Sequence, residues 1–518
     1  MKVALVNAAH PAIGSRMAGE HLPPLGLLAI GGPLLDAGHE VRLFDGDFAG
    51  TPPAQLAQQV AAARPDAVLL GHSGSSSAQP VLDEVAQRVR ALLPGAHIIL
   101  GGVFPTYHWA DILRRQPCYD AIVRGEGEET ALQLVNALER GTPLDTVRGI
   151  AWRCAGVPVC NAPAPITCDL DAHRVAWDLM GQRRYAYWGG QRAVLYQFSR
   201  GCTHACTYCG QRFFWRKWRC RDPQKAAAEI AMLHRDYGVR VVNFADESPA
   251  ENQAAWRAFL EALIREHLDG LALVGSIRAD HVVRDADFLH LYRQAGFERF
   301  LLGLESYDEA VLARLKKGSD TRVDARAIRL LRQHGILSMA TLGVGFGDER
   351  LSDFWRTLRC LLRYDPDQIQ FMYATPHRWT PYYKQVQDRA ICQSDQRKWD
   401  YRHQVLAPQH MPPWAVTLCV KAMEAVMQAR PRAIWRTLAQ PDARRRAAMR
   451  WYSRIGTRVW FAELWRALVT DGQACQRTTV AQFWAAPDEA PPPAAAIQFV
   501  PNAPASSYTP IGKASLPA

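Results

Sequence analysis

The chain has 518 residues, and its 61 Lys and Arg against 50 Asp and Glu give a formal net charge of +11. Its 48% hydrophobic and 21% charged residues are typical of a soluble globular protein, and its length predicts about three domains. Twelve cysteines are too sparse for a disulfide scaffold, and no apolar stretch approaches the ~18–20 residues of a membrane-spanning helix. We therefore expect a cytoplasmic protein with at most peripheral membrane contact. Because the positive charge is spread along the chain, we expect no nucleic-acid partner.

Residues 1–150 alternate between strand-like and helix-like segments. Amphipathic stretches separate short apolar runs at 3–6, 41–44, 67–70, 97–100 and 121–123. This alternation predicts an α/β domain with a doubly wound, Rossmann-like parallel sheet. In such sheets ligands bind at the carboxyl ends of the strands, and the loops expected there are rich in Gly and Ser.

A second βα alternation fills residues 193–385, after a connector at 151–192. Its six strand-like runs predict a partial or full parallel β/α barrel of the TIM type, with the active site at the carboxyl ends of the strands. Residues 386–485 are predicted to be a helical domain rich in Trp and Arg. The Pro-, Ala- and Ser-rich residues 486–518 are predicted to be a disordered tail.

Cys202, Cys206 and Cys209 form a C-x3-C-x2-C triplet directly after the first predicted barrel strand. Three thiolates on one loop can hold three irons of a [4Fe–4S] cluster and leave the fourth iron open to a substrate. A zinc site is the alternative, and His204 lies inside the loop. Structural zinc takes four ligands, however, and no second C-x2-C pair follows with suitable spacing. The position after a strand favours the cluster.

This triplet, in this place, resembles the radical SAM superfamily. The resemblance implies that S-adenosylmethionine (SAM) chelates the open iron and that its reductive cleavage gives a 5′-deoxyadenosyl radical. It also implies SAM-binding residues beside the third cysteine and at successive strand ends. These are Tyr208, Asp246, Glu247, Ser276, Arg278 and Glu305. The alternative for each is an ordinary solvated or paired side chain at a strand end.

A radical SAM barrel preceded by a doubly wound domain resembles the cobalamin-binding subclass. Small residues at the strand ends allow a corrin to approach the backbone closely. The expected cobalamin-binding residues are Ser73, Ser75, Gly101, Gly102, Thr106, Gly125 and Glu126. The D-x-H-x-x-G motif is absent, so we expect cobalamin to bind without a protein imidazole. A nucleotide-binding or vestigial domain is the alternative.

Three segments sharpen the resemblance: FFWRKWRCRDP at 213–223, ADESP at 245–249 and MYATPHRWTP at 372–381. They resemble the anaerobic magnesium-protoporphyrin IX monomethyl ester cyclases. The resemblance implies formation of the isocyclic ring of protochlorophyllide in bacteriochlorophyll biosynthesis, with oxygen from water. It also implies a tetrapyrrole substrate and an external electron donor such as ferredoxin or flavodoxin. The aromatic residues expected to line the pigment pocket, unless they simply pack in the core, are Trp215, Trp218, Tyr373 and Trp379.

Two segments depart from the cyclases: HLPPLG at 21–26 and LES at 304–306 follow the general form of cobalamin radical SAM enzymes. A cobalamin-dependent radical SAM C-methyltransferase acting on a tetrapyrrole or another unactivated carbon therefore stays open. A non-catalytic cobalamin-binding sensor is the third hypothesis. The Arg-rich stretch at 430–458 predicts either a basic face for anionic lipid or a carboxylated pigment, or a solvated or acid-paired surface.

Overall fold

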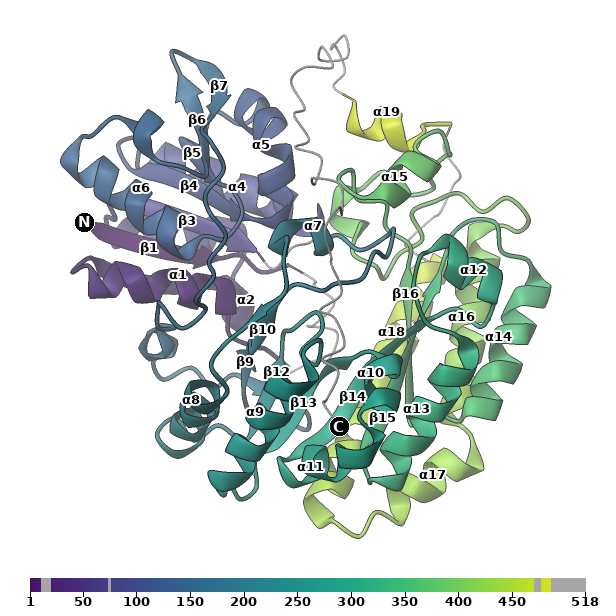
Figure 1. Cartoon of the computed structure of the whole chain (residues 1–518). Helices are drawn as coiled ribbons and strands as arrows, with labels where there is room; N and C mark the ends of the chain where they lie inside the picture. The colour runs from purple at the N-terminus through teal and green to yellow at the C-terminus, as the bar shows by residue number, and fades with distance from the viewer. Residues whose placement is uncertain (11–19, 73–75, 470–476, 486–518) are drawn as a thin grey trace, which may run out of the picture.

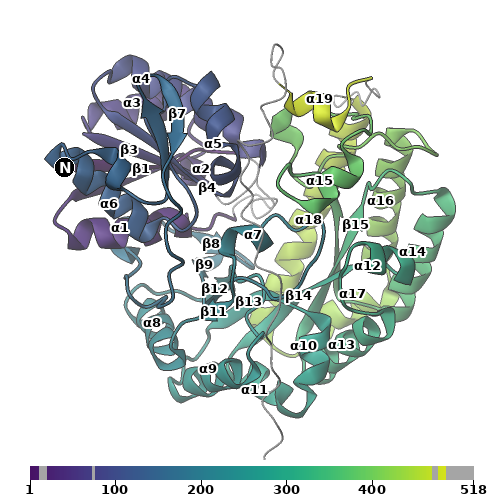
Figure 2. The same ribbon diagram turned by 45° about the horizontal axis from the view of Figure 1, so that its top comes forward.

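A computed structural model describes residues 1–10, 20–72, 76–469 and 477–485. Two seven-stranded sheets lie side by side, and helices pack against each of them, as Figures 1 and 2 show. The predicted cobalamin residues Ser73 and Ser75 and the predicted tail at 486–518 lie outside the described residues.

The first sheet has the strand order β2-β1-β3-β4-β5-β6-β7. Its first five strands are parallel, whereas β6 pairs antiparallel with β5 and β7 antiparallel with β6. The strands are β1 (Lys2–Asn7), β2 (Glu40–Asp45), β3 (Ala67–His72), β4 (His97–Gly102), β5 (Ala121–Val123), β6 (Ile150–Cys154) and β7 (Val157–Cys160). The β6–β7 hairpin of this sheet therefore falls within the predicted connector.

Helices cover both faces of this sheet because its strands are apolar on both sides. In β1, Val3 and Leu5 face the core shared with α1 and α6, whereas Ala4 and Val6 face the core shared with α3, α4 and α5. The helices are α1 (Leu25–Asp36), α2 (Gly46–Ala49), α3 (Pro53–Ala62), α4 (Gln79–Leu92), α5 (Val103–Arg115) and α6 (Glu128–Arg140). We call this unit the N-terminal domain.

The second sheet has the order β16-β15-β14-β13-β12-β9-β8. Six of its strands run parallel, and the short β8 pairs antiparallel with β9. The strands are β8 (Ala186–Tyr187), β9 (Gln191–Tyr196), β12 (Val241–Phe244), β13 (Ala272–Ile277), β14 (Phe297–Glu305), β15 (Leu337–Val344) and β16 (Gln368–Tyr373). β16 is not paired with β8, so this is an open, partial barrel, as predicted.

Side chains such as Val194, Val242 and Phe300 on the outer face of the barrel pack in one core with the surrounding helices. These helices are α8 (Pro223–Arg235), α9 (Gln253–Arg265), α10 (Ala279–Arg284), α11 (Leu289–Gln294), α12 (Glu309–Arg314), α13 (Thr321–Gln333) and α14 (Leu351–Tyr364). Between β9 and α8 the chain forms a small ribbon with the elements β10 (Ser199–Arg200), α7 (Arg212–Trp215) and β11 (Arg219–Cys220).

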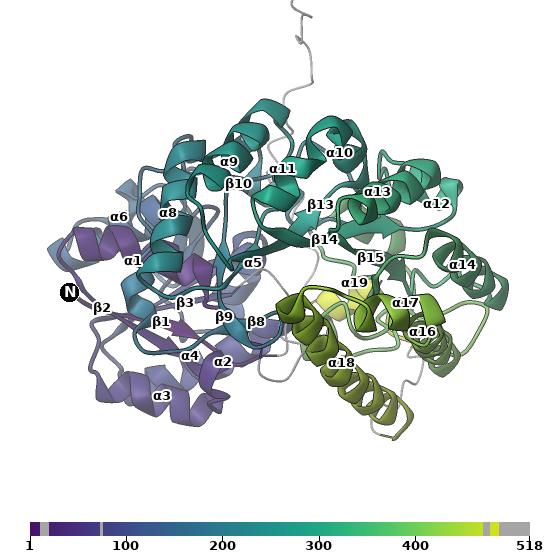
Figure 3. The same ribbon diagram turned by 90° about the horizontal axis from the view of Figure 1, so that it is seen from below.

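The C-terminal helices are α15 (Pro381–Val386), α16 (Pro413–Gln428), α17 (Pro431–Leu438), α18 (Ala443–Val469) and α19 (Val480–Trp484). Of these, α16, α17 and α18 cover the open side of the barrel, whereas α15 and α19 lie at the carboxyl end of its strands, beside the N-terminal domain. Figure 3 shows α18 lying below the sheet, with α16 and α17 on one side of it and β8 on the other. No helix in the described part of the chain is both long and apolar enough to cross a membrane.

Candidate functional site

The loop that carries the three cysteines leaves the barrel after β9 and is held by a buried carboxylate. Asp246, just after β12, accepts hydrogen bonds from the backbone N–H of Phe198 at 3.1 Å and from Ser199 Oγ at 2.6 Å. Burial raises the pKa of Asp246 to about 7. At Gly201 the φ angle is +92°, and a Cβ there would lie 2.7 Å from the carbonyl oxygen of Lys217, so only glycine fits this turn.

The three cysteines lie within residues 202–209 at the carboxyl end of the barrel strands. Cys206 is buried, and Cys202 and Cys209 are half-buried. The thiol of Cys202 donates to Glu251 at 3.5 Å, and burial raises its pKa to about 12. Iron must therefore displace a proton at this sulfur when it binds.

Three of the six predicted SAM residues lie together near Cys206. Arg278 donates to the carbonyl oxygen of Lys317 at 3.1 Å, and Lys317 Nζ lies 3.1 Å from Glu305 Oε1. The pKa of Tyr208 is raised first by burial and then by the charges of Glu305 and Cys206. Lys317 was missed by the sequence interpretation, because it lies in the loop between α12 and α13 and follows no strand.

The other three predicted SAM residues have different surroundings. Asp246 holds the cysteine loop, as described above. Glu247 accepts hydrogen bonds from Trp215 Nε1 at 2.6 Å and from the N–H of Gly201 at 3.4 Å, and burial raises its pKa to about 7. Ser276 lines a cavity on the inner face of the barrel.

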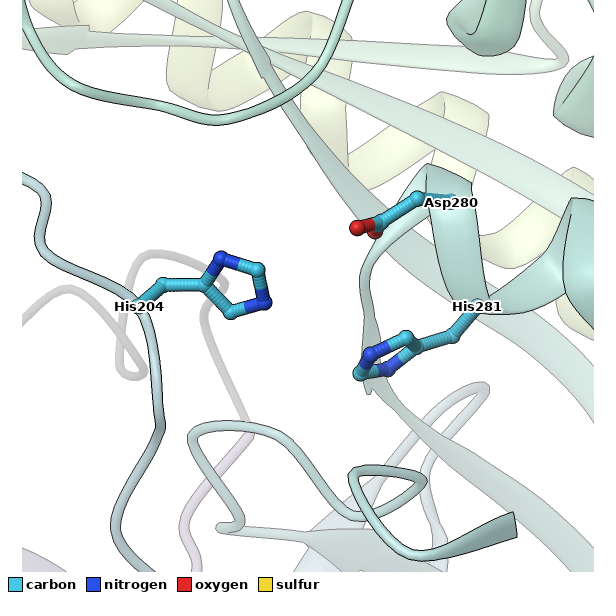
Figure 4. Close-up of side chains that lie close together, drawn as sticks. All are labelled: His204, Asp280 and His281. Carbon is cyan, nitrogen blue, oxygen red and sulfur yellow. The ribbon is translucent and has the colours of Figure 1, made fainter. Parts of the chain in front are cut away.

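A nitrogen and oxygen donor set lies beside the cysteine loop. His204, Asp280 and His281 each offer a ligand atom, and these atoms lie within 4.8 Å of one another. Figure 4 shows the His204 side chain extending across a gap toward the other two. His204 therefore has two nearby ligand groups outside the cysteine triplet. Thiolates are the usual ligands of iron–sulfur clusters, so the cysteines remain the better match for one.

The predicted cobalamin residues that the structure describes lie at the carboxyl ends of β4 and β5. Thr106 Oγ1 donates to the carbonyl oxygen of Gly102 at 2.7 Å and accepts from the N–H of Gly125 at 3.0 Å, so it joins the two loops. Gly101 ends β4 beside Gly102. At Gly125, where φ is +82°, no atom of the described residues, apart from its chain neighbours, lies within 4 Å of the position of a Cβ. This backbone is therefore open to the close approach of a flat ligand.

Glu126 has a different task, because it joins the N-terminal domain to the barrel. Its carboxylate lies 2.9 Å from Arg200 and 2.9 Å from Arg219. Arg200 also pairs with Glu128 at the start of α6. Both arginines flank the ribbon that carries the cysteines, so this ion-pair network fixes the cysteine loop against the N-terminal domain.

Three of the four aromatic residues of the predicted pigment pocket lie beside the cysteine loop, and Tyr373 lies apart from them at the end of β16. Trp218 Nε1 donates to the carbonyl oxygen of Ser248 at 3.0 Å, and Trp379 Nε1 donates to that of Gly210 at 2.9 Å. Trp215 is bound to Glu247, as described above, and Tyr373 is buried at the end of β16. None of the four lines the barrel cavity.

A cavity of about 940 Å³ lies between the inner face of the barrel sheet and α16, α17 and α18. The Arg-rich stretch divides around it. Arg430 and Arg436 pair with Asp365, which agrees with the acid-paired interpretation. Arg450 and Arg454 are exposed and line the cavity.

An α/β cobalamin-type domain joined to a partial barrel with a cysteine triplet defines a class, and comparisons with known proteins agree with it. The B12 binding domain family matches residues 13–135, and the Radical SAM superfamily matches residues 196–361. The radical SAM module implies a [4Fe–4S] cluster and SAM, and the other module implies cobalamin.

Among curated proteins, the anaerobic magnesium-protoporphyrin IX monomethyl ester cyclase of Synechocystis sp. is 50% identical over 94% of this chain and 98% of its own length. The cyclase of Cereibacter sphaeroides is 30% identical over 75% of this chain and 64% of its own length. The solved structure of the cobalamin-dependent S-adenosylmethionine radical enzyme OxsB with aqua-cobalamin bound shares the fold, with a TM-score of 0.67 and 18% identity over 86% of this chain and 72% of that one. The chain belongs to the family of anaerobic magnesium-protoporphyrin IX monomethyl ester cyclases.

Proposed function

We propose that this protein catalyses the anaerobic oxidative cyclisation of magnesium-protoporphyrin IX monomethyl ester, forming the isocyclic ring of protochlorophyllide with oxygen from water. The observation that carries this proposal is the 50% identity to the Synechocystis sp. cyclase over nearly the full length of both chains. The arrangement of the two modules supports it, since the cysteine loop faces the N-terminal domain through Arg200 and Glu126.

Each part of the site has a task in this reaction. Cys202, Cys206 and Cys209 hold the [4Fe–4S] cluster, and Tyr208, Arg278 and Glu305 bind SAM beside it. The loops at Gly101, Gly102 and Gly125 hold cobalamin, together with Ser73 and Ser75 of the sequence prediction. When bound, these cofactors supply the radical that abstracts hydrogen from the unactivated side chain. The aromatic residues beside the loop, the buried Trp379 and the half-buried Trp215 and Trp218, exclude water from this chemistry.

The partners follow from the reaction. The substrate is a tetrapyrrole that carries one free carboxylate, and reductive SAM cleavage takes electrons from an external donor such as ferredoxin or flavodoxin. We place the enzyme in the cytoplasm.

The test is an anoxic assay of the reconstituted protein with magnesium-protoporphyrin IX monomethyl ester, SAM, cobalamin and reduced flavodoxin. We expect protochlorophyllide that carries one oxygen atom from ¹⁸O-labelled water. Cys202→Ala is expected to abolish the product, because one iron loses its ligand. A product that has gained one methylene would show the methyltransferase instead. Unchanged turnover by Cys202→Ala would refute the radical mechanism.

A further inference from the structure

The barrel cavity contains a buried guanidinium that forms no ion pair with a carboxylate of the described residues. Arg299 lies in β14, is only 5% exposed and lines the cavity. Its hydrogen-bond partners are neutral: Tyr187 Oη at 2.8 Å and Gln368 Oε1 at 3.3 Å. Its Nε atom is buried without a hydrogen-bond partner. Among the described residues, no carboxylate lies within the 4.0 Å of an ion pair with Arg299. A buried charge of this kind is costly unless something pairs with it.

The acidic side chains of the cavity already have other partners. Glu424 and Glu463 bind Lys421 at 2.8 and 2.7 Å. Asp367 lies 3.1 Å from Arg436, and Glu20 accepts a hydrogen bond from the N–H of Trp188 at 2.9 Å. The charge of Arg299 also acts on Glu20, whose pKa is raised by burial and lowered by this charge, but the two groups form no ion pair. An anion that enters the cavity can therefore make the direct ion pair that Arg299 lacks.

Aromatic rings hold the guanidinium in place. Its central carbon lies 4.3 Å from the Trp188 ring centre and 5.6 Å from those of Tyr187 and Tyr452. Such stacking fixes the plane of the guanidinium, which suits bidentate binding of a carboxylate.

The rest of the cavity suits a large flat ligand. Its volume of about 940 Å³ is at the upper end of the roughly 300–1,000 Å³ typical of ligand pockets. Leu195, Leu301, Met339 and Ile369 line it from the strands, and Trp460 lines it from α18. The inner barrel wall thus offers apolar side chains together with polar ones such as Asn243 and Gln370, and Arg299 is the buried arginine among them.

The cavity also reaches the carboxyl ends of the strands. Arg299 pairs with Val274 in the register of β13 and β14, and Leu301 pairs with Ser276. Ser276 therefore stands two residues, or about 7 Å, closer than Arg299 to the carboxyl edge where SAM is expected. A ligand held at Arg299 can extend a neighbouring side chain toward that edge.

We propose that this cavity binds the tetrapyrrole, with its free propionate carboxylate on Arg299. This inference rests on the proposed function. The monomethyl ester keeps one carboxylate, and the esterified side chain that reacts lies next to it on the same edge of the macrocycle. Arg299 is a specificity-determining residue. It places the free propionate of the substrate deep in the barrel and the esterified side chain nearer the carboxyl ends of the strands, where SAM is expected.

The test compares binding of magnesium-protoporphyrin IX monomethyl ester with binding of the dimethyl ester, which has no carboxylate, by titration of the Soret absorption. We expect the wild type to prefer the monoester by roughly 30-fold or more, and Arg299→Met to bind both esters equally, because the buried charge pair is lost. Arg299→Lys is expected to keep part of the preference. Arg257→Met, which removes an exposed arginine on α9, is the control and should keep all of it.

Two outcomes would overturn the proposed binding site: a wild type that binds both esters equally, or an Arg299→Met variant that keeps the preference for the monoester. A purely structural role for Arg299 would weaken both esters alike. If Arg299→Met does not fold, the wild-type preference and Arg299→Lys decide the question. Because binding is measured without turnover, this experiment can refute the proposed binding site and leave the proposed formation of protochlorophyllide unaffected. The binding site can equally be confirmed even if the product proves to be a methylated tetrapyrrole.

Discussion

His377 shows how one residue joins the separate parts of the site. It is fully buried, and its Nδ1 lies 3.1 Å from Ser76 Oγ of the N-terminal domain. Its Nε2 contacts the hydroxyl of Tyr401, and its ring stacks on Trp379 at 4.7 Å. The same ring approaches the cysteine loop, since a Cβ at Gly210 would lie 3.5 Å from it. Both ring nitrogens have neutral partners, so a neutral imidazole suits this place.

This burial predicts an acid-sensitive stability. Burial lowers the pKa of His377 to about 3 from the usual 6.5. The unfolded chain therefore takes up a proton below pH 6.5 while the folded chain does not. The stability that the neutral His377 contributes to the folded chain is fully present above pH 6.5 and is lost as the pH falls toward 3. Between pH 8 and 5.5 this residue should cost about 1.4 kcal/mol of unfolding free energy.

The measurement is urea unfolding of the wild type, His377→Gln and His290→Gln at both pH values. His290 is exposed on α11, so its variant should keep the wild-type difference between pH 8 and 5.5. His377→Gln should reduce that difference by about 1.4 kcal/mol, whatever its absolute stability. An equal difference in all three proteins would contradict a neutral His377.

At the scale of single residues, the sequence could predict groups that are close in the chain or follow a strand. The spacing of the three cysteines and the polar residues after β13 and β14 belong to this kind. The task of Asp246 could not be predicted, because its hydrogen bonds to Phe198 and Ser199 require β9 and β12 to be adjacent in the sheet. Lys317 was missed because it lies in a loop that follows no strand, and its contact with Glu305 forms only in the folded chain.

At the scale of elements, the packing of α18 decides the shape of the barrel cavity. The helix approaches the β8–β9 turn closely: a Cβ at Gly189 would lie 3.0 Å from the Cα and Cβ of Ala448. Tyr452, one turn further along α18, lies 5.6 Å from the ring of Trp188. Residues of α18 from 449 to 463 then line the cavity. The small residue at 189 thus allows the helix to close the open side of the barrel.

Gly189→Ala is therefore expected to displace α18. Gly189 and Gly190 both have positive φ, +86° and +70°, but no atom lies within 4 Å of a Cβ at Gly190. Gly190→Ala should cost only the backbone strain, about 1–2 kcal/mol. Gly189→Ala should cost about 1–3 kcal/mol more from overpacking, and should raise the KM for the tetrapyrrole without changing SAM cleavage.

Urea unfolding and steady-state kinetics of the two variants measure this difference. Equal stability and equal KM in Gly189→Ala and Gly190→Ala would show that α18 does not depend on this contact. Because the two glycines are adjacent, any effect on the turn itself appears in both.

At the scale of the whole molecule, buried ion pairs fix the N-terminal domain against the barrel. Arg200, Arg219 and Glu126 are each at most 13% exposed at the side chain. Arg378 adds a second bridge, 2.5 Å from Asp111 of α5. These contacts set the distance between the predicted cobalamin loops and the cysteine loop, which a reaction that uses both cofactors requires.

Arg200→Met is expected to loosen this junction. It leaves Glu128 buried without its partner, which typically costs about 3–5 kcal/mol. Calorimetry should then show two separate unfolding transitions in place of one. Arg235→Met removes an exposed pair with Glu266 and should change stability by less than about 1 kcal/mol. A single unshifted transition in Arg200→Met would show that the pair does not couple the domains.

The sequence by itself determined the two α/β units, the cysteine loop and the cofactors. The periodicity of strands and helices and the spacing of ligands are local properties, because each depends on residues that are close in the chain. Only the tertiary structure decided that α18 closes the barrel, that Glu126 pairs with Arg200, and that Arg299 is buried with no ion pair among the described residues. These features depend on contacts between residues far apart in the chain, such as the 301 positions between Ser76 and His377. An unpaired charge is costly only when it is buried, and burial is a property of the packed molecule alone.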